Sequence, residues 1–231
     1  MSLLLNDELI WVSIPRNASN SIEKALYKSD IKIEHCNNKY TDLNPENKSF
    51  QHVHYHLNFL SYHWPNKKTI CIKRDWLERW ISGLEHFWRV MDISSITPII
   101  PFDEIDNDFV YKVIPHLQNA FLTSNGMLNG MQFFIKEDIK KIPINESYLT
   151  LNLLYPQQWW LGNKTCDYEF DVKEIWKFEK FILDSYNTKI ELGNFNKSIG
   201  LKNKVVYDDN LKNALWEILV KPYTKVNDKI I

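Results

Sequence analysis

Glycine is scarce in this chain, and the glycine-rich loops that most often bind phosphate are absent. The sequence has six glycines in 231 residues, and none precedes Gly83. Neither GxxxxGK[ST] nor GxGxxG occurs. These absences argue against an ordinary P-loop nucleoside triphosphatase and against a dinucleotide-dependent dehydrogenase.

An excess of charge of one sign is also missing. The formal net charge is -1 and the sequence pI is about 6.7. A general nucleic-acid binder needs a marked basic excess, so nucleic acid is not an expected partner. The same balance disfavours a highly anionic polysaccharide as a substrate.

Long apolar runs, cysteine pairs and linkers are lacking as well. No apolar stretch reaches 18 residues, and the first residues lack the basic segment of a signal peptide, so we expect a cytoplasmic protein without a membrane span. Cys36, Cys71 and Cys166 are widely spaced and are expected to be reduced thiols. Because no Pro/Gly/Ser-rich stretch or repeat divides the chain, we expect a single domain over residues 1–231.

The pattern of apolar residues predicts strands that alternate with helices. Such alternation is typical of an α/β fold with a central parallel sheet flanked by helices. The pattern predicts strands over 9–14, 31–35, 69–73 and 175–178, and helices over 19–27, 76–90, 107–123, 179–189 and 209–219. Asn17 or Ser19 is expected to cap the first helix and Asp75 the second.

The stretch WVSIPRNASNSI, residues 11–22, ends a predicted strand and opens a predicted helix. The N–H groups at a helix N-terminus bind anions, and Arg16 adds a fixed charge with several donors. Ser19 and Ser21 add hydroxyls. The segment therefore predicts an anion site, although a capped helix with a surface arginine would have the same pattern.

Residues 69–87 repeat the strand-turn-helix plan, with Arg74 at the strand end and Ser82 within the next helix. In parallel sheets, ligands bind at the carboxyl ends of the strands, so both segments point to one edge. His52 lies between the two segments, followed by His54 and His56. Two anion-binding corners with a possible base between them suggest transfer of a group from a doubly phosphorylated nucleotide.

These segments resemble a known enzyme family in order and spacing. PRNASNS resembles the 5′-phosphosulfate loop of sulfotransferases that use 3′-phosphoadenosine 5′-phosphosulfate (PAPS), and IKRDWLERWISGLEHF resembles their 3′-phosphate motif. FQHVHY, residues 50–55, resembles the histidine segment of the uronyl 2-O-sulfotransferase branch of the carbohydrate sulfotransferases. The similarity covers roughly residues 8–90, with a weaker match at Lys197 and Ser198.

The resemblance implies a P-loop-like three-layer fold and a sulfotransferase with PAPS as donor and 3′-phosphoadenosine 5′-phosphate (PAP) as product. It implies that no metal takes part and that the acceptor is a hydroxyl, with a carbohydrate favoured. His52 would be the general base, and Arg16, which stands where the family usually has lysine, would stabilise the leaving group. The residues expected to bind the nucleotide are Arg16, Asn17, Ala18, Ser19, Asn20, Ser21, Arg74, Ser82, Lys197 and Ser198.

Other interpretations of the same residues stay open. An extended segment 52–56 would place its three histidines on one face, as in a metal site, and His52 could equally be structural. Arg79 is expected to be structural, in an internal ion pair, and Trp159 and Trp160 either line an acceptor site or pack on the sheet. A nucleotide kinase of the wider P-loop group and a non-catalytic nucleotide-binding module are the alternative functions.

Overall fold

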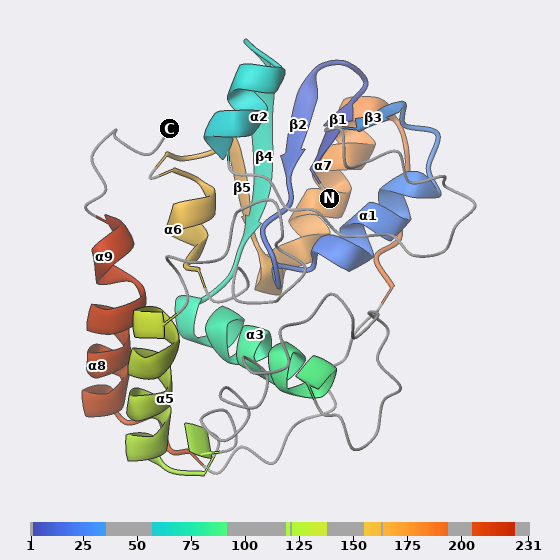
Figure 1. Ribbon diagram of the computed structural model, residues 1–231. Coiled ribbons are helices and arrows are strands. Elements are labelled where there is room, and N and C mark those ends of the chain that lie inside the picture. The colour runs from blue at the N-terminus through green and yellow to red at the C-terminus, as the bar shows by residue number, and fades with distance from the viewer. Residues whose placement is uncertain are drawn as a thin grey trace, which may run out of the picture. The chain divides into compact units, whose positions relative to one another are not determined.

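The structure is a computed structural model, which describes residues 2–35, 57–91, 119–120, 122–137, 155–162, 164–193 and 205–224 (Figure 1). The chain divides into two compact units. The first comprises Met1–Arg79 and Gln157–Lys197, and the second Trp80–Pro156 and Ser198–Ile231. This division does not test the expectation of one domain, which stays a prediction.

The first unit contains a five-stranded sheet with the order β3-β1-β2-β4-β5. Its strands are β1 (Leu3–Leu5), β2 (Leu9–Val12), β3 (Ile33–His35), β4 (Lys68–Lys73) and β5 (Tyr168–Asp171). The pairs β2–β4 and β4–β5 are parallel, whereas β1 is antiparallel to both β2 and β3. The α/β class is confirmed, but the sheet is mixed where a central parallel sheet was predicted, because β1, which lies between β3 and β2, is antiparallel to both.

The difference arises from a hairpin at the start of the chain. Asn6 and Asp7, which follow β1, have φ angles of 48° and 60°, and the N–H of Glu8 donates to the carbonyl of Leu5 at 3.0 Å. Asn and Asp tolerate this left-handed conformation and so favour a tight reversal. The hairpin inserts β1 between β2 and β3, which still run in the same direction. The predicted strands 9–14 and 31–35 and the helix between them therefore correspond to a β-α-β unit, β2-α1-β3, with one antiparallel strand between its two strands.

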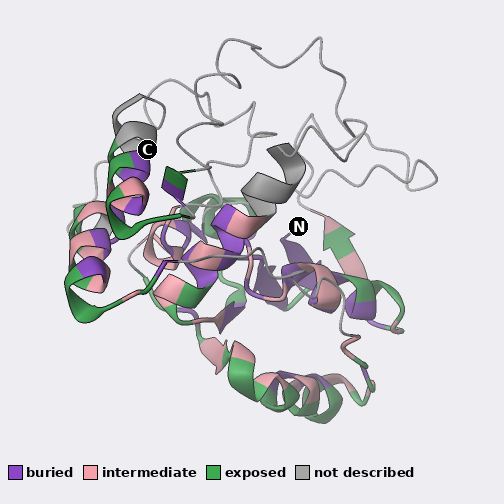
Figure 2. Ribbon diagram, turned by 90° about the horizontal axis from the view of Figure 1, so that it is seen from below, coloured by how far each residue is buried: buried purple, intermediate pink, exposed green. Residues whose placement is uncertain are grey.

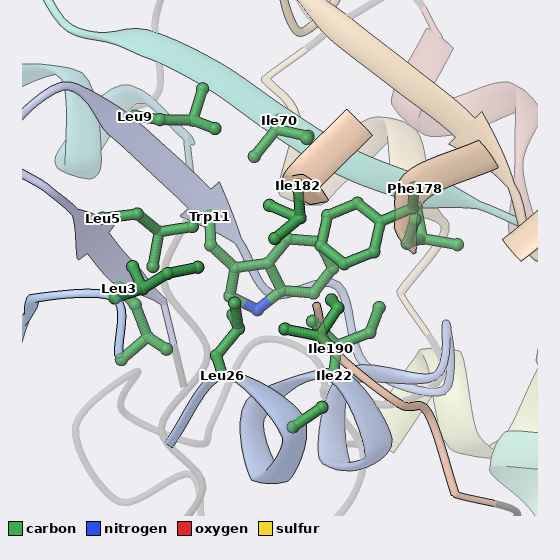
Figure 3. Close-up of a cluster of buried hydrophobic side chains, with 13 residues drawn as sticks. Leu3, Leu5, Leu9, Trp11, Ile22, Leu26, Ile70, Phe178, Ile182 and Ile190 are labelled. Carbon is green, nitrogen blue, oxygen red and sulfur yellow. The ribbon is translucent and has the colours of Figure 1, made fainter. Parts of the chain in front are cut away.

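One face of the sheet forms a core with two helices, α1 (Ser19–Tyr27) and α7 (Ile175–Tyr186) (Figure 3). Alternate strand residues point into this core because successive side chains of a strand face opposite sides. Trp11 lies at its centre and its ring centroid is 5.6 Å from that of Phe178. The other members are Leu3, Leu5, Leu9, Ile22, Ala25, Leu26, Ile31, Ile70, Ile72, Ile182 and Ile190.

Helix prediction succeeded where apolar spacing and a polar first turn coincide. α1 has the predicted bounds, α8 is Asp209–Leu219 as predicted, and α3 is Trp76–Met91. The strand predicted over 175–178 is wrong, because these residues begin α7 and the strand is β5, seven residues earlier. Phe178 and Ile182 are both fully buried and four residues apart, which is the spacing of one helical face.

Short elements complete the first unit. The structure has α2 (Leu57–His63), α6 (Gln157–Trp160) and the 3₁₀ turn η4 (Val172–Glu174). Asp171 caps η4 by accepting from the N–H of Lys173 at 2.7 Å. α6 and β5 fall in a region for which the sequence predicted no regular structure.

The second unit contains α5 (Ser124–Glu137), α8 and α9 (Lys221–Thr224), together with α3 from Trp80 onwards. α5 and α8 pack against each other, and each has a buried and an exposed side (Figure 2). Asp208 caps α8 through the N–H of Leu211 at 2.8 Å. The helix predicted over 107–123 lies largely outside the described residues. Among the helices that the structure describes, none is both long and apolar enough to cross a membrane.

Candidate anion site at the carboxyl edge of the sheet

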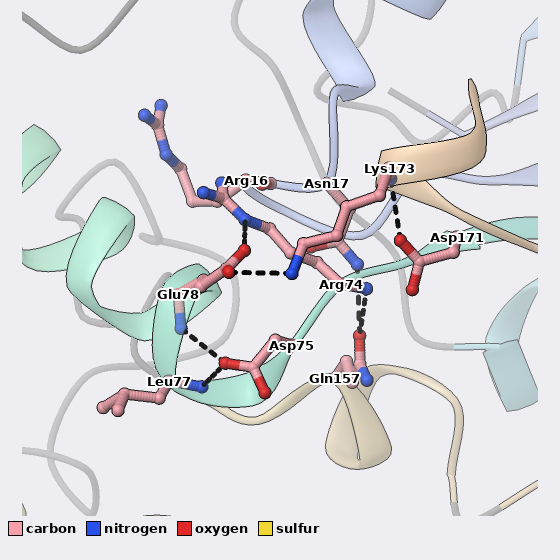
Figure 4. Close-up of polar contacts among 9 residues, drawn as sticks. All are labelled: Arg16, Asn17, Arg74, Asp75, Leu77, Glu78, Gln157, Asp171 and Lys173. Atoms are coloured by element: carbon pink, nitrogen blue, oxygen red, sulfur yellow. Dashed lines mark hydrogen bonds and ion pairs between the residues drawn. The ribbon is translucent and has the colours of Figure 1, made fainter. Parts of the chain in front are cut away.

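Two loops meet at the carboxyl ends of the adjacent parallel strands β2 and β4. The β2–α1 loop, residues 13–18, leads into α1, and the β4–α3 loop, Arg74 and Asp75, leads into α3. The Asp75 carboxylate accepts from the N–H groups of Leu77 and Glu78 at 3.1 and 3.0 Å, so the predicted cap of α3 is confirmed (Figure 4). The two segments singled out in the sequence therefore lie side by side.

The β2–α1 loop has an unusual backbone for a segment without glycine. Arg16 and Ala18 have φ angles of 67° and 60°. Turn conformations of this kind can arrange backbone N–H groups around a concavity that binds an anion. Because the first turn of a helix has no intrahelical acceptors for its N–H groups, those of Ser19 and Asn20 add to this supply of donors.

The expected side-chain cap of α1 is wrong. Ala18 occupies the cap position, and no side chain accepts a capping hydrogen bond there. Asn17 is instead buried, with 1% of its surface exposed, and its amide Nδ2 donates to the carbonyl of Ile72 at 2.7 Å and to Oε1 of Gln157 at 3.2 Å. Its Oδ1 is buried without a hydrogen-bond partner among the described residues. Asn17 thus joins the loop to β4 rather than to its own helix.

Arg74 contacts the β2–α1 loop directly. Its Nη1 donates to the carbonyl of Arg16 at 3.3 Å, and its Nε lies 3.7 Å from the carboxylate of Glu78 one helical turn later. Glu78 also pairs with Lys173, at 3.0 Å, from the turn that follows β5 (Figure 4). The carboxyl ends of three neighbouring parallel strands therefore contribute charged side chains to one edge.

Arg79 is buried behind the same loop. It is 1% exposed, and its Nε donates to the carbonyl of Pro15 at 3.0 Å. Burial, together with the positive charges of Arg16 and Arg74, lowers the pKa of the Arg79 guanidinium to about 9. The expectation of a structural role is supported by the bond to Pro15, but the charge of Arg79 also adds to that of the other two arginines. An anion at this edge would relieve their mutual repulsion.

Of the remaining predicted binding residues, some lie on α1 next to the β2–α1 loop, one lies on α3, and the others are outside the described residues. Ser19 is buried, and Asn20 and Ser21 are half-buried, in the first turn of α1. Ser82 is 8% exposed on the part of α3 that belongs to the second unit. The other predicted site residues, His52, Lys197 and Ser198, lie outside the described residues, as do His54 and His56.

Two residues that sequence reasoning missed support the loops. Glu23 is 2% exposed on α1 and accepts from the hydroxyl of Ser13 at 2.7 Å. It stands among the apolar positions of the helix, between Ile22 and Ala25, where a carboxylate is unexpected. Gln157 contacts both loops, and nothing in the sequence around it indicates this contact.

Trp159 and Trp160 belong to α6, the short helix that begins at Gln157. Trp160 is buried and packs edge-on against Trp159 at 4.8 Å between ring centroids, as the packing interpretation expects for Trp160.

Cys71 and Cys166 are free and buried. Their two sulfur atoms and one carboxylate oxygen of Glu169 all lie within 4.8 Å of one another. A hydrogen bond with Cys166 and burial raise the pKa of the Cys71 thiol. Lys73 already pairs with Glu169, at 2.5 Å, and its ammonium opposes a second cation there.

Comparison with protein-family models, with curated proteins and with solved structures finds no match to this chain. The function is therefore argued from the site and from the sequence motifs.

Proposed function

We propose that this protein is a sulfotransferase that moves a sulfuryl group from PAPS to a hydroxyl of an acceptor, with a carbohydrate favoured. The observation that carries the proposal is the cluster of Arg16, Arg74 and Arg79 at the carboxyl edge of adjacent parallel strands. Guanidinium groups bind phosphate through paired donors, and ligands of such sheets bind at this edge.

Two separate loops favour a nucleotide with two separate phosphate positions. The β2–α1 loop offers backbone N–H groups and Arg16 for a 5′-phosphosulfate, while Arg74 stands at the end of the neighbouring strand for a 3′-phosphate. A kinase of the wider P-loop group is less well supported, because the loop lacks the Gly-Lys-Ser/Thr that such enzymes use for a triphosphate with Mg²⁺.

The proposed reaction is an in-line displacement at sulfur. The acceptor oxygen forms a bond to sulfur, the bond from sulfur to the 5′-phosphate oxygen breaks, and the bonding pair leaves with PAP. The hydroxyl proton passes to His52 as general base. Arg16 stabilises the negative charge that develops on the departing phosphate, which is electrostatic catalysis of the kind found in phosphoryl transfer.

The arrangement of charge supports this assignment of roles. Arginine stays protonated, so Arg16 acts as a fixed positive charge and not as a proton donor to the leaving group. The sulfuryl group carries less negative charge than a phosphoryl group, so the loop's N–H groups and arginines replace the metal that phosphoryl transfer needs.

A thermal-shift titration tests the donor site. We expect PAP to raise the melting temperature of the purified protein more than ATP or adenosine 5′-phosphate does, because a ligand bound by the native state alone stabilises it by mass action. Arg74→Ala should lose most of the shift, whereas Lys212→Ala, which changes a half-buried basic residue on α8 of the second unit, should keep it. An equal shift with ATP would favour the kinase, and PAP binding without sulfate transfer to any hydroxyl acceptor would favour a binding module.

A further inference from the structure

Gln157 bridges the two loops of the anion site through one oxygen. Its Oε1 accepts from Nδ2 of Asn17 at 3.2 Å and from the backbone N–H of Arg74 at 3.3 Å (Figure 4). Asn17 belongs to the β2–α1 loop and Arg74 to the β4–α3 loop, so a residue from a third segment of the chain joins them.

Both donors are parts of the anion site itself. Asn17 directly follows Arg16 in sequence, and the N–H that Gln157 receives is that of Arg74. The guanidinium of Arg74 in turn donates to the carbonyl of Arg16 at 3.3 Å. The backbone positions of these two arginines are therefore linked through the amide of Gln157 as well as through their own contact.

The burial of Asn17 restricts the movement of the β2–α1 loop relative to Gln157. Asn17 is 1% exposed, and its Nδ2 is shared between Gln157 and the carbonyl of Ile72, at 2.7 Å on β4. If a buried amide loses one of its acceptors, its free N–H can find another acceptor only if the side chain or its loop moves. Removal of Gln157 would thus leave the Asn17 amide with the carbonyl of Ile72 as its one acceptor among the described residues and would remove the link from Asn17 to the backbone of Arg74.

The amide is also the right chemical group for this position. A carboxylate would accept the same two hydrogen bonds but would add a second negative charge, besides that of Glu78, at the loops that carry Arg16 and Arg74, where it would oppose an anionic ligand. An uncharged acceptor organises the loops without neutralising the arginines.

We infer that Gln157 is a positioning residue that sets the spacing between the two loops and so makes the site selective for a nucleotide phosphorylated at both its 3′ and its 5′ position. This inference rests on the proposed function. A nucleotide with one phosphate needs only one loop in place, whereas a bisphosphate needs both at a fixed separation.

The test compares the dissociation constants of PAP and adenosine 5′-phosphate by isothermal titration calorimetry. We expect Gln157→Ala to weaken PAP binding by about tenfold, the effect of losing one to two neutral hydrogen bonds, and to weaken adenosine 5′-phosphate binding much less. Gln157→Glu should keep both acceptors and the unliganded melting temperature but should weaken both nucleotides. Gln158→Ala is the matched control, because the Oε1 of Gln158 has no hydrogen-bond partner among the described residues.

Two results would separate the inference from the function on which it rests. Wild-type protein that does not prefer PAP would overturn the proposed function. Wild-type protein that prefers PAP, with the same preference in Gln157→Ala, would overturn the positioning role alone. Should the alanine variant fail to fold, Gln157→Met removes the acceptor while filling the same space and provides the same comparison.

Discussion

At the scale of single residues, the candidate site combines several energetically unfavourable features of the backbone and of buried side chains. Arg16 and Ala18 hold left-handed conformations that cost a non-glycine residue about 1–2 kcal/mol each. Asn17 keeps a buried oxygen without a hydrogen-bond partner among the described residues, and Arg79 keeps a buried positive charge. Unfavourable features of this kind gather at binding sites, where a ligand compensates them.

Arg79→Met should separate stability from binding. Methionine removes the desolvation cost of the buried charge but leaves the Pro15 carbonyl without its donor, so we expect the free energy of unfolding without ligand to fall by no more than about 1–3 kcal/mol. The stabilisation by PAP should largely disappear. Urea denaturation with and without PAP measures both quantities, and a variant that keeps full stabilisation by PAP would show that Arg79 only supports the loop through Pro15.

Arg16→Ala should reduce turnover more than nucleotide binding. Loss of one group that stabilises developing charge typically costs a factor of about 10²–10³ in kcat. Alanine keeps the same backbone preference as arginine, so the left-handed conformation at this position is equally strained in both proteins. Single-turnover sulfate transfer from PAPS gives the rate, Lys24→Ala on the exposed side of α1 is the control, and a near-normal rate would contradict the role of Arg16.

At the scale of elements, short polar contacts hold the ends of the strands that carry the loops. Asp167, just before β5, accepts from the N–H and the hydroxyl of Thr69 on β4 at 2.7 and 2.8 Å. Thr69 accepts in return from the N–H of Asp167 at 3.1 Å. This pair fixes the start of the β4–β5 ladder, whose carboxyl end leads to Arg74 and Lys173.

Asp167→Ala should destabilise the protein in a pH-dependent way. We expect a loss of about 1–3 kcal/mol in the free energy of unfolding near neutral pH, because the variant leaves the hydrogen-bonding groups of Thr69 without their acceptor. The hydrogen bonds from Thr69 lower the pKa of Asp167. Its contribution is therefore complete above the ordinary aspartate pKa of about 4 and is lost as the pH falls through the lower folded value.

Urea denaturation of wild type and variant between pH 7 and pH 2 measures this difference. It should be constant down to about pH 4 and shrink below that pH. Asp184→Ala, which removes an exposed ion pair with Lys180 on α7, should cost less than about 1 kcal/mol. A difference between wild type and Asp167→Ala that grows in acid would contradict the assignment.

At the scale of the whole molecule, the proposed function needs the described anion site together with a base. The arginines and loops belong to the first unit, and the proposed base, His52, belongs to a segment outside the described residues. Binding and turnover are therefore expected to respond to different substitutions.

His52→Ala should abolish turnover and leave donor binding intact. Removal of a general base typically costs a factor of about 10²–10⁴, while the dissociation constant of PAP should change by less than about twofold. His63→Ala, an exposed histidine on α2, is the control and should transfer sulfate normally. Loss of PAP binding in His52→Ala would indicate a structural role for His52 instead.

Local patterns in the sequence were sufficient for the features that depend on neighbours along the chain. The bounds of α1 and α8, the cap of α3 by Asp75 and the position of both loops at strand ends all follow from apolar spacing and short-range hydrogen bonds. The mixed strand order, the burial of Arg79 and the arrival of Gln157 between the loops were decided by the tertiary structure. The contacts of Arg79 with Pro15 and of Gln157 with Asn17 join residues tens of positions apart, and such contacts leave no periodic signal in the sequence because packing in three dimensions selects them. The antiparallel strand β1 instead follows from a local turn at Asn6 and Asp7, which apolar spacing does not indicate, and its place between β2 and β3 depends on pairing with a distant strand.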